Sequence, residues 1–454
     1  MRSSVEGISL YYTSLGCDKN LTDAEHMLYD LDQAGYVMVS DPAEARVIVI
    51  NTCCFISDAM EESIDTILDL SRYRQEGKLE ALIVTGCLST RFSDLIHEEL
   101  PEVDAFLTTT SYDHLTEVIG SVLSGKPEDS IESDDRLPVN RGRLLSQGGY
   151  SAYLKIAEGC NKGCSYCVIP SIRGPYRSIP MEELLNEASD LVSKGVRELI
   201  LVAQETTLYG VDLYGHKSLH ELVTKLSEIR SLAWIRILYA YPEEIYDELI
   251  TVMAENPKVC HYLDIPIQHS SDHILSAMKR RTRHDELIES VKRLREAIPD
   301  IALRTTIITG FPGETEEDHR ENLRFVREMK FDRLGCFMYS PQEGTEAAEF
   351  PDQVDPVVAQ IRYDDIMIAQ QDVVFAKNES LVGCEFDVIV EGALPEEESD
   401  LYVGRTYRDA PDVDGLIFFK SPFSYMSGDI VRLRVTASKD YDLIGVPYED
   451  ESTQ

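Results

Sequence analysis

The sequence predicts an α/β protein of three domains: a doubly wound parallel sheet, a partial parallel barrel of six strand–helix units, and a small antiparallel β-barrel at the C-terminal end. Three observations lead to this prediction. Short β-branched strands alternate with amphipathic helices along most of the 454 residues. A polar stretch interrupts this alternation once, and short strands with turns replace it near residue 378. A chain of this length also exceeds what one hydrophobic core supports.

The doubly wound sheet is expected in residues 1–125. Short β-branched runs separated by helices are typical of a parallel sheet that is covered on both faces. The expected strands are 8–13, 47–51, 81–85 and 105–109, and the expected helices are 18–34, 58–74, 89–100 and 112–123. Residues 126–148 are rich in charged residues, Pro, Gly and Ser, and they predict a linker.

The partial barrel is expected in residues 149–377, because six strand–helix units in a row make about three quarters of an eightfold barrel. Its expected strands are 152–157, 198–203, 235–240, 261–266, 303–309 and 333–339, and its expected helices are 181–194, 218–230, 243–255, 285–297 and 315–329. The small antiparallel barrel is expected in residues 378–454. Its expected strands are 385–391, 401–405, 415–419 and 429–438.

Composition narrows the functional classes. The formal charge is −38, and residues 378–454 alone carry 17 acidic and 6 basic residues, a net charge of −11. Nucleic-acid binding draws on Lys and Arg, so this balance argues against direct nucleic-acid binding and favours a basic partner. No apolar run is long enough to span a membrane, and residues 1–6 do not begin a signal peptide. The ten cysteines therefore predict metal or redox chemistry in the cytoplasm.

Three cysteines lie close together on one loop after the first barrel strand. Cys160, Cys164 and Cys167 are separated by three residues and then by two. Thiolates at this spacing can bind three irons of a 4Fe-4S cluster and leave the fourth iron open to a substrate or cofactor. A structural zinc site would require a fourth ligand, and no further His or Cys lies nearby.

Polar residues follow the other barrel strands, where parallel barrels place their active sites. Gln204 and Glu205 follow the second strand and His269 follows the fourth. We expect such strand ends to hold a nucleoside and an amino-acid moiety beside the open iron. His269 is either catalytic or a structural hydrogen-bonding residue. Arg173 and Arg177 are either solvated or capping charges, or contacts to a substrate carboxylate or backbone.

Three further cysteines, Cys17, Cys53 and Cys87, lie just past the first three expected strands of the N-terminal domain. Parallel strands deliver these ends to one edge of the sheet, so the three loops can bring three thiolates together around a second cluster. Cys54 would point away from Cys53, although an exchange between the two stays open. The remaining cysteines alternate with apolar neighbours and are expected in the core: Cys260, Cys336 and Cys384.

The loop 158–167, with Tyr166 before its last cysteine, resembles the signature of the radical S-adenosylmethionine (SAM) superfamily. From Ile8 to Val446 the chain resembles the methylthiotransferases, which join an N-terminal domain with three cluster cysteines, a radical-SAM barrel and a C-terminal TRAM domain. The motifs are Ser14-Leu15-Gly16-Cys17-Asp18-Lys19-Asn20 and residues 404–415. Ala24 and Cys54 depart from the family pattern, and neither departure removes a ligand.

This resemblance implies a transferase with two 4Fe-4S clusters and S-adenosyl-L-methionine as cofactors. Catalytic ligands of the radical-SAM cluster would be Cys160, Cys164 and Cys167, and cofactor-binding residues would be Tyr166, Gln204 and Glu205. Ligands of an auxiliary cluster, the station for the transferred sulfur, would be Cys17, Cys53 and Cys87.

The resemblance is strongest to members that modify a ribosomal protein. The implied reaction is methylthiolation of the β-carbon of an aspartate in small-subunit ribosomal protein S-twelve, with two SAM molecules. The alternative is methylthiolation of a modified adenosine in tRNA, and the acidic C-terminal domain favours the basic protein. An electron-transfer or cluster-carrier protein is a third interpretation. Implied partners are an electron donor such as flavodoxin or ferredoxin and a sulfur donor, without a membrane.

Overall fold

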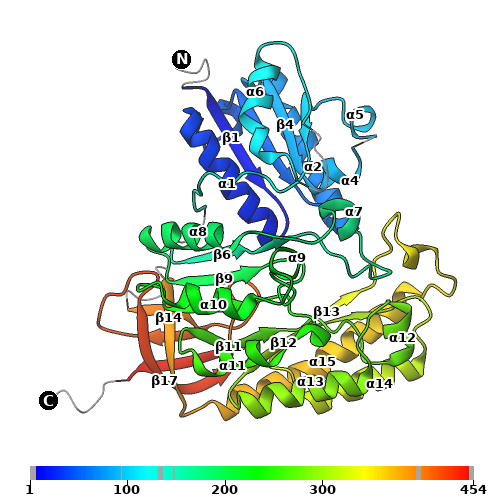
Figure 1. The fold of residues 1–454 in the computed structure, drawn as a ribbon, viewed down its shortest axis with the longest axis vertical. Coiled ribbons are helices and arrows are strands. Elements are labelled where there is room, and N and C mark those ends of the chain that lie inside the picture. Colours follow the sequence, from blue (N-terminus) through cyan, green and yellow to red (C-terminus); the bar gives the residue numbers. More distant parts are fainter. Residues whose placement is uncertain (1–6, 94, 131–135, 147–148, 395–399, 449–454) are drawn as a thin grey trace.

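The computed structural model describes residues 7–93, 95–130, 136–146, 149–394 and 400–448. Residues 1–6, and residues 131–135 and 147–148 of the expected linker, lie outside this described part. Within it, the chain forms a five-stranded parallel sheet, a six-stranded parallel sheet and a closed five-stranded barrel (Figure 1). The predicted α/β class with these three architectures is confirmed. No helix of the described residues is long and apolar enough to cross a membrane.

The N-terminal sheet has the strand order β2-β1-β3-β4-β5. Its strands are β1 (Ser9–Ser14), β2 (Val37–Met38), β3 (Val47–Thr52), β4 (Ala81–Gly86) and β5 (Ala105–Leu107). Every residue of β3 and β4 is buried, as expected for central strands covered on both faces. Successive side chains of a strand point to opposite faces of the sheet, so Ile48 and Ile50 pack in the core on one face and Val47 and Val49 pack in the core on the other.

Helices cover both faces of this sheet (Figure 1). The face with Val47 packs against α1 (Asp18–Ala34) and α6 (Leu115–Leu123), and the face with Ile48 packs against α2 (Ser57–Ser71) and α4 (Cys87–Arg91). Shorter helical turns are η1 (Pro42–Glu44), α3 (Tyr73–Glu76), α5 (Ile96–Glu99) and η2 (Tyr112–His114). The expected helix 89–100 is therefore two short helices, α4 and α5.

The central sheet is parallel throughout, with the order β13-β12-β11-β10-β9-β6. Its strands are β6 (Ser151–Lys155), β9 (Glu198–Val202), β10 (Trp234–Ile237), β11 (Val259–Asp264), β12 (Ala302–Thr309) and β13 (Arg333–Met338). In β12, Leu303 and Ile307 join the core under the helices, whereas Arg304 and Thr306 stay partly exposed. Because side chains alternate along a strand, Arg304 faces the concave side.

The helices on the convex side follow the strands in order. They are α8 (Met181–Ser193), α10 (Leu219–Ser227), α11 (Asp247–Glu255), α13 (His284–Ala297) and α14 (Glu316–Met329). Smaller elements are β7 (Ala157–Glu158), α7 (Ile169–Arg173), β8 (Arg177–Ser178), α9 (Val211–Tyr214), η3 (Pro242–Glu244), α12 (Asp272–Ala277) and η4 (Glu346–Glu349). In Figure 1, α7 lies beside the N-terminal domain.

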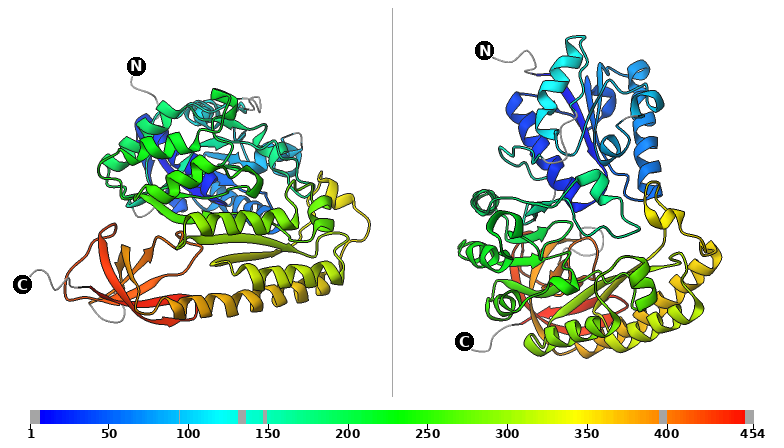
Figure 2. Two further views of the ribbon diagram at one scale, coloured as in Figure 1. Left: turned by 60° about the horizontal axis from the view of Figure 1, so that its bottom comes forward. Right: turned by 45° about the vertical axis from the view of Figure 1, so that its right-hand side comes forward.

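A 25-residue helix, α15 (Pro356–Ser380), connects the central sheet to the C-terminal barrel. Figure 2 shows α15 running beside α14 toward that barrel. The sequence pattern did not predict this helix. Its apolar residues are spread around its circumference: Ile366 is buried, whereas Val357 and Ile368 are exposed. An apolar stripe with a period of 3.6 residues is therefore missing.

The C-terminal barrel is closed, in the order β14-β15-β16-β18-β17. Its strands are β14 (Glu385–Ala393), β15 (Leu401–Thr406), β16 (Ile417–Lys420), β17 (Ile430–Lys439) and β18 (Asp442–Pro447). All its strand pairs are antiparallel except β16–β18, and β18 was not among the expected strands. Ile389 and Ala410 of this barrel pack into the concave side of the central sheet against Tyr262.

A buried ion cluster joins the barrel to the central sheet. Glu198 of β9 is 2.9 Å from Arg236 and 2.7 Å from Arg405, and all three side chains are nearly inaccessible. Burial alone would raise the pKa of Glu198, but the two guanidinium groups lower it to about 2. Since breaking a buried pair leaves an uncompensated charge, this cluster ties the C-terminal barrel to one position.

Candidate functional site

The structure brings the two sets of predicted cluster cysteines to the carboxyl ends of their parallel sheets. Cys17 caps the N-terminus of α1 directly after β1, Cys53 follows β3, and Cys87 begins α4 after β4. Cys160, Cys164 and Cys167 follow β7 on a loop without regular structure. Carboxyl ends of parallel strands are where α/β proteins bind ligands.

The loops of Cys17 and Cys53 are held together by a close approach at Gly16 and by hydrogen bonds from the Asn20 side chain to the backbone. A Cβ on Gly16 would lie 2.9 Å from the Sγ of Cys53, so only glycine lets these two loops approach each other. The Asn20 amide group donates to the carbonyl oxygens of Leu15, at 2.6 Å, and Thr52, at 3.1 Å. These hydrogen bonds fix the loop of Cys17 against the loop of Cys53.

Cys53 and Cys54 occupy different surroundings. Cys54 is fully buried and belongs to the apolar core under α2 and α4. Burial raises the pKa of the Cys54 thiol to about 12. Cys53 also has a raised pKa, mainly through burial and partly through the nearby Cys17. The Cys87 thiol lies close enough to Cys54, Cys17 and Cys53 for each to raise its pKa, so Cys54 is near the three expected ligands although its side chain packs in the apolar core.

The loop of the second set is shaped by Gly159 and by the segment that follows it. The φ of Gly159 is +80°, and a Cβ there would lie 2.2 Å from the carbonyl oxygen of Pro175, which excludes any other residue. The amide of Cys160 donates to the carbonyl of Gly174 at 3.2 Å. Burial raises the pKa of Cys167 to about 12, with smaller effects from Cys164 and Cys160. The three thiols are thus neighbours.

Gln204 and Glu205 lie beside this loop. Gln204 donates to Glu158 at 3.1 Å, and its side-chain oxygen is buried without a hydrogen-bond partner. Glu205 accepts from the amide of Thr207 at 3.0 Å, while its Oε2 lies 3.7 Å from Lys162 and lacks a hydrogen bond. Burial raises the pKa of Glu205 to about 7.

Arg280 is a functional candidate that the sequence did not single out. Its guanidinium is buried 4.3 Å from the ring centroid of Tyr241, and its Nε and Nη1 have no hydrogen-bond partner among the described residues. Tyr166 and Cys164 are both close enough to raise the pKa of Arg280. Tyr166 itself packs edge-on against Phe311, with ring centroids 6.4 Å apart. A buried guanidinium that keeps two unused donors near Cys164 and Cys167 suits an anionic group.

Arg173 is neither solvated nor a simple cap, contrary to one of the expectations from sequence. It is fully buried where the N-terminal domain meets the barrel. Its Nη1 donates to Asp23 at 2.6 Å and to Glu158 at 3.2 Å, and its Nη2 donates to Asn20 at 3.1 Å. Arg173 and Asp23 are 150 residues apart in the sequence, so no local pattern could indicate this role.

The remaining residues considered from the sequence are one histidine and three cysteines outside the two cluster sites. His269 is fully buried, accepts a hydrogen bond from the amide of Ser271 at 3.0 Å and lies 3.5 Å from Glu314. These contacts favour the structural role over the catalytic one. Cys260 and Cys336 are buried as predicted. The expectation for Cys384 was wrong: it is exposed, because it lies in the turn before β14.

The donor sets fit 4Fe-4S clusters and SAM. Three thiols at each site are the ligands that iron–sulfur clusters require. Unsatisfied buried groups beside the second loop (Gln204 Oε1, Glu205 Oε2, Arg280 Nε and Nη1) supply both acceptors and donors for an amino acid and a nucleoside. The described residues contain no His, Cys, Asp and Glu group arranged around a single metal ion.

A cavity of about 420 Å³ lies between the loop of Cys17 and the concave face of the central sheet. It is lined by Cys17 from the N-terminal domain, by Tyr239 and Arg304 from the central sheet, and by Pro411 and Asp412 from the C-terminal barrel. We refer to it as the central cavity. Its volume suits a single side chain or a short peptide segment.

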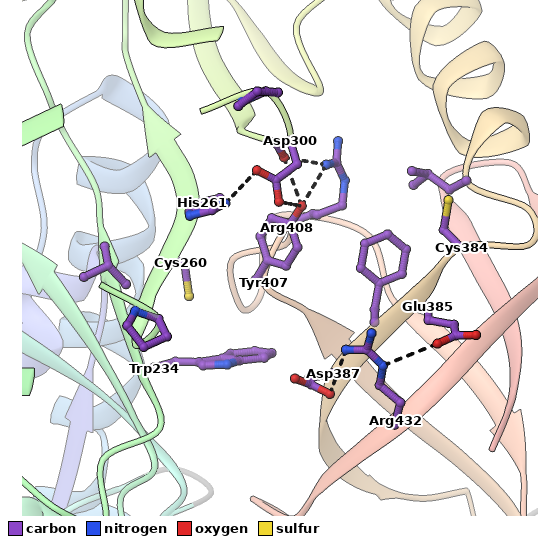
Figure 3. A pocket seen from close by; sticks show the side chains of 15 residues that line it. Trp234, Cys260, His261, Asp300, Cys384, Glu385, Asp387, Tyr407, Arg408 and Arg432 are labelled. Carbon is purple, nitrogen blue, oxygen red and sulfur yellow. Dashed lines mark hydrogen bonds and ion pairs between the residues drawn. The ribbon is translucent and has the colours of Figure 1, made fainter. Parts of the chain in front are cut away.

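A second cavity, of about 660 Å³, lies at the amino ends of the central strands (Figure 3). Trp234 and His261 line it from the sheet, and Arg432 lines it from the barrel, where it is hydrogen-bonded to Asp387 at 3.2 Å. The catalytic loops of parallel barrels lie at the opposite ends of the strands, so this cavity is not the site of the six cysteines that are expected to bind the clusters.

Three family models match the chain. The Radical SAM superfamily matches residues 154–326, the uncharacterized protein family UPF0004 matches residues 9–108, and the TRAM domain matches residues 382–447. Among solved structures, the radical S-adenosylmethionine methyltransferase TsrM from Kitasatospora setae, bound to tryptophan and a SAM analogue, gives a TM-score of 0.57 at 12% identity. The match covers 82% of this chain and 90% of TsrM, and it shows the likeness in fold.

Curated relatives are much closer in sequence. The ribosomal protein uS12 methylthiotransferase RimO of Lachnoclostridium phytofermentans is 54% identical over 439 residues, which cover 96% of this chain and 99% of the relative. The RimO protein of Geobacter sulfurreducens is 51% identical over 447 residues, with coverage of 98% and 99%. The chain belongs to the RimO family of radical SAM methylthiotransferases.

Proposed function

We propose that this protein methylthiolates the β-carbon of an aspartate in small-subunit ribosomal protein S-twelve. The main support for this proposal is the near full-length identity of 54% to a protein named ribosomal protein uS12 methylthiotransferase RimO. The enzyme is a transferase that uses two 4Fe-4S clusters and two SAM molecules. When bound, these cofactors supply an electron, a 5′-deoxyadenosyl radical that abstracts hydrogen from carbon, and the methylthio group.

The residues of this chain would position these cofactors. Cys160, Cys164 and Cys167 would bind one cluster, and Cys17, Cys53 and Cys87 the other. Tyr166, Gln204 and Glu205 would contact SAM. Glu205 is fully buried and Gln204 is half-buried, and each has a buried side-chain oxygen without a hydrogen-bond partner among the described residues, which suits the charged amino group of an amino acid. Arg280, with two unpaired donors, would hold the carboxylate or balance the charge of the thiolates.

The C-terminal barrel supports a protein substrate over tRNA. Its few basic residues are largely engaged within the protein: Arg405 pairs with Glu198, Arg408 pairs with Asp332, and Arg434 pairs with Glu385. These guanidinium groups are therefore not free for phosphate contacts. An acidic surface of this kind suits a basic ribosomal protein.

The remaining partners follow from the chemistry. A one-electron donor such as flavodoxin or ferredoxin would reduce the radical-SAM cluster, and a sulfur donor would replenish the transferred sulfur. With these two donors and a ribosomal substrate, the enzyme would act in the cytoplasm. The three anchored domains and the central cavity favour catalysis over simple electron or cluster transfer.

Mass spectrometry of ribosomal proteins and tRNA from cells lacking the gene tests this function. We expect S-twelve from these cells to be lighter than S-twelve from wild-type cells by about 46 Da, the mass difference between a methylthio group and the hydrogen that it replaces. The modification of tRNA should stay unchanged. Loss of a methylthio nucleoside with intact S-twelve would instead establish the tRNA activity. Release of 5′-deoxyadenosine by the purified, reduced protein separates either enzyme from a cluster carrier.

A further inference from the structure

We infer that Arg304 binds the carboxylate of the substrate aspartate in the central cavity and thereby selects aspartate as the residue to be modified. This inference rests on the proposed function, which makes an aspartate the target. It concerns a specificity-determining residue on β12 that is neither a proposed cluster ligand nor one of the residues proposed to contact SAM.

Charge in the central cavity singles out Arg304. Among the described residues that line the cavity, Arg304 is the one cation, whereas Asp18, Asp264 and Asp412 are acidic. Asp18 is ion-paired with Lys19 and Asp264 with Arg304, so Arg304 is the cavity-lining cation whose remaining N–H groups can bind an entering carboxylate. Carboxylate recognition by arginine is also geometrically specific, since the planar guanidinium can donate two parallel hydrogen bonds.

The guanidinium retains donors for a ligand. Its Nη1 donates to Asp264 at 2.9 Å, and its Nε lies 3.6 Å from Asp414, too far for a hydrogen bond. These are the contacts of Arg304 with charged side chains of the described residues, and a guanidinium carries five N–H groups. The side chain of Arg304 keeps 19% of its surface exposed, so the remaining donors are accessible from the cavity.

The two neighbouring carboxylates form ion pairs with Arg304 and hold it in place, and each of them also has a hydrogen-bond donor of its own. Asp414 accepts from the hydroxyl of Tyr262 at 2.7 Å and from the amide of Ala410 at 2.9 Å. Asp264 accepts from the amide of Tyr239 at 3.2 Å. Both acids are therefore hydrogen-bonded independently of Arg304. A cation fixed in this way loses little conformational entropy when it binds a ligand.

The position of Arg304 matches the chemistry that is required. Cys17, a proposed ligand of the auxiliary cluster, lines the same cavity. In an aspartate side chain the β-carbon is bonded directly to the carboxyl carbon. Two hydrogen bonds from Arg304 to the carboxylate would therefore also fix the position of the reacting carbon. Such orientation of a reacting centre is a large source of rate enhancement. Asparagine, with a neutral amide, would lose the charge-assisted pair.

The test compares small ribosomal subunits that carry S-twelve with either Asp or Asn at the modified position. The iron-loaded enzyme and its Arg304→Gln and Arg304→Lys variants are assayed for kcat/KM, and for the 5′-deoxyadenosine formed per methylthio product. For the wild type we expect a preference for Asp of about tenfold to a hundredfold, the usual range for a charge-assisted hydrogen bond. In Arg304→Gln we expect this ratio to fall to about one, with a higher KM for Asp and more deoxyadenosine per product.

The controls separate the possible failures. Arg432→Gln removes a surface arginine of the C-terminal barrel and should keep the wild-type ratio. A wild-type enzyme that modifies neither substrate refutes the proposed function itself. Equal use of Asp and Asn by the wild type, or an unchanged ratio in Arg304→Gln, refutes only the role of Arg304. If Arg304→Gln does not load iron, Arg304→Lys decides, because it keeps the charge but loses the planar fork, and an unchanged ratio there also overturns the inference.

Discussion

The Nη2 of Arg173 lies 3.5 Å from the Sγ of Cys87, while the Nη1 of the same guanidinium contacts Glu158, two residues before Cys160. One buried cation therefore touches a proposed ligand of one cluster and the strand that leads to the other. Burial alone would raise the pKa of Glu158, but Arg173 and Lys155 lower it to about 2, so Glu158 is ionised.

Replacing Arg173 with Gln should impair the auxiliary cluster. The change leaves two buried carboxylates, Asp23 and Glu158, to share one ion-pair partner, Lys155, and it removes the cation beside Cys87, so we expect a destabilisation of about 3–5 kcal/mol and loss of auxiliary iron. Iron analysis and electron paramagnetic resonance measure the loss. Arg173→Lys is the matched control and should retain most of the iron; equal loading of the wild type and Arg173→Gln would contradict the role.

The two clusters should be separable by single cysteine changes. We expect about eight irons per chain in the wild type and about four in either variant. Cys164→Ala should abolish cleavage of SAM while the N-terminal cluster remains, and Cys87→Ala should still produce 5′-deoxyadenosine but no methylthio product. Deoxyadenosine from Cys164→Ala, or methylthio product from Cys87→Ala, would refute the assignments.

Cys53 and Cys54 form a matched pair for a third test. Cys53 lies against the loop of Cys17, whereas Cys54 packs in an apolar core, so Cys53→Ser should lose auxiliary iron and Cys54→Ser should retain it. Cys54→Ser should instead cost about 1–3 kcal/mol, because a hydroxyl is introduced into that core. Iron content and thermal unfolding distinguish the two outcomes, and the reverse iron contents would make Cys54 the ligand.

Glu198→Gln should loosen the C-terminal barrel. The change leaves the buried Arg405 and Arg236 without their shared carboxylate, for an expected cost of about 3–5 kcal/mol in unfolding free energy. Glu385→Gln, which breaks a partly exposed pair with Arg434, should cost less than about 1 kcal/mol. Urea unfolding measures both changes. Equal stability of the two variants would show that the buried cluster does not anchor the barrel.

The stability contributed by Glu205 should decrease as pH rises. Its folded pKa of about 7 lies above the ordinary value of 4.5, so the folded state binds the proton more tightly. That contribution is fully present below pH 4.5 and is lost as pH rises through 7, to an extent of about 3 kcal/mol. Glu205→Gln should therefore gain melting temperature relative to the wild type between pH 5 and pH 8. Anaerobic calorimetry checks this; parallel pH profiles would contradict it.

Sequence periodicity could predict most of the fold because β3, β4 and the central strands are short, apolar and bounded by helices with clear amphipathic faces. It failed for α15, whose apolar residues do not form one stripe, and for Cys384, whose alternating neighbours indicated a core position although the residue lies in a turn. Burial in these cases depends on packing between domains.

The cysteines of the site could be located from sequence, since their spacing and their places after strands carry the chemistry. Arg173, Arg280 and Arg304 could not be assigned in the same way. Each lies on an ordinary helix end, turn or strand, and its role comes from partners or cavities formed by distant segments. A single arginine in a sequence is more often a solvated charge, and only the tertiary structure distinguishes these three.

The continuous helix α15 makes the spacing between the central sheet and the C-terminal barrel sensitive to single-residue insertions or deletions. Each residue of an α-helix advances the chain by about 1.5 Å and turns it by about 100°. One extra residue within Pro356–Ser380 would therefore rotate the attached barrel and carry residues 411–413 out of the wall they form beside Cys17. We conclude that the length of α15 determines where the C-terminal barrel sits over the central cavity.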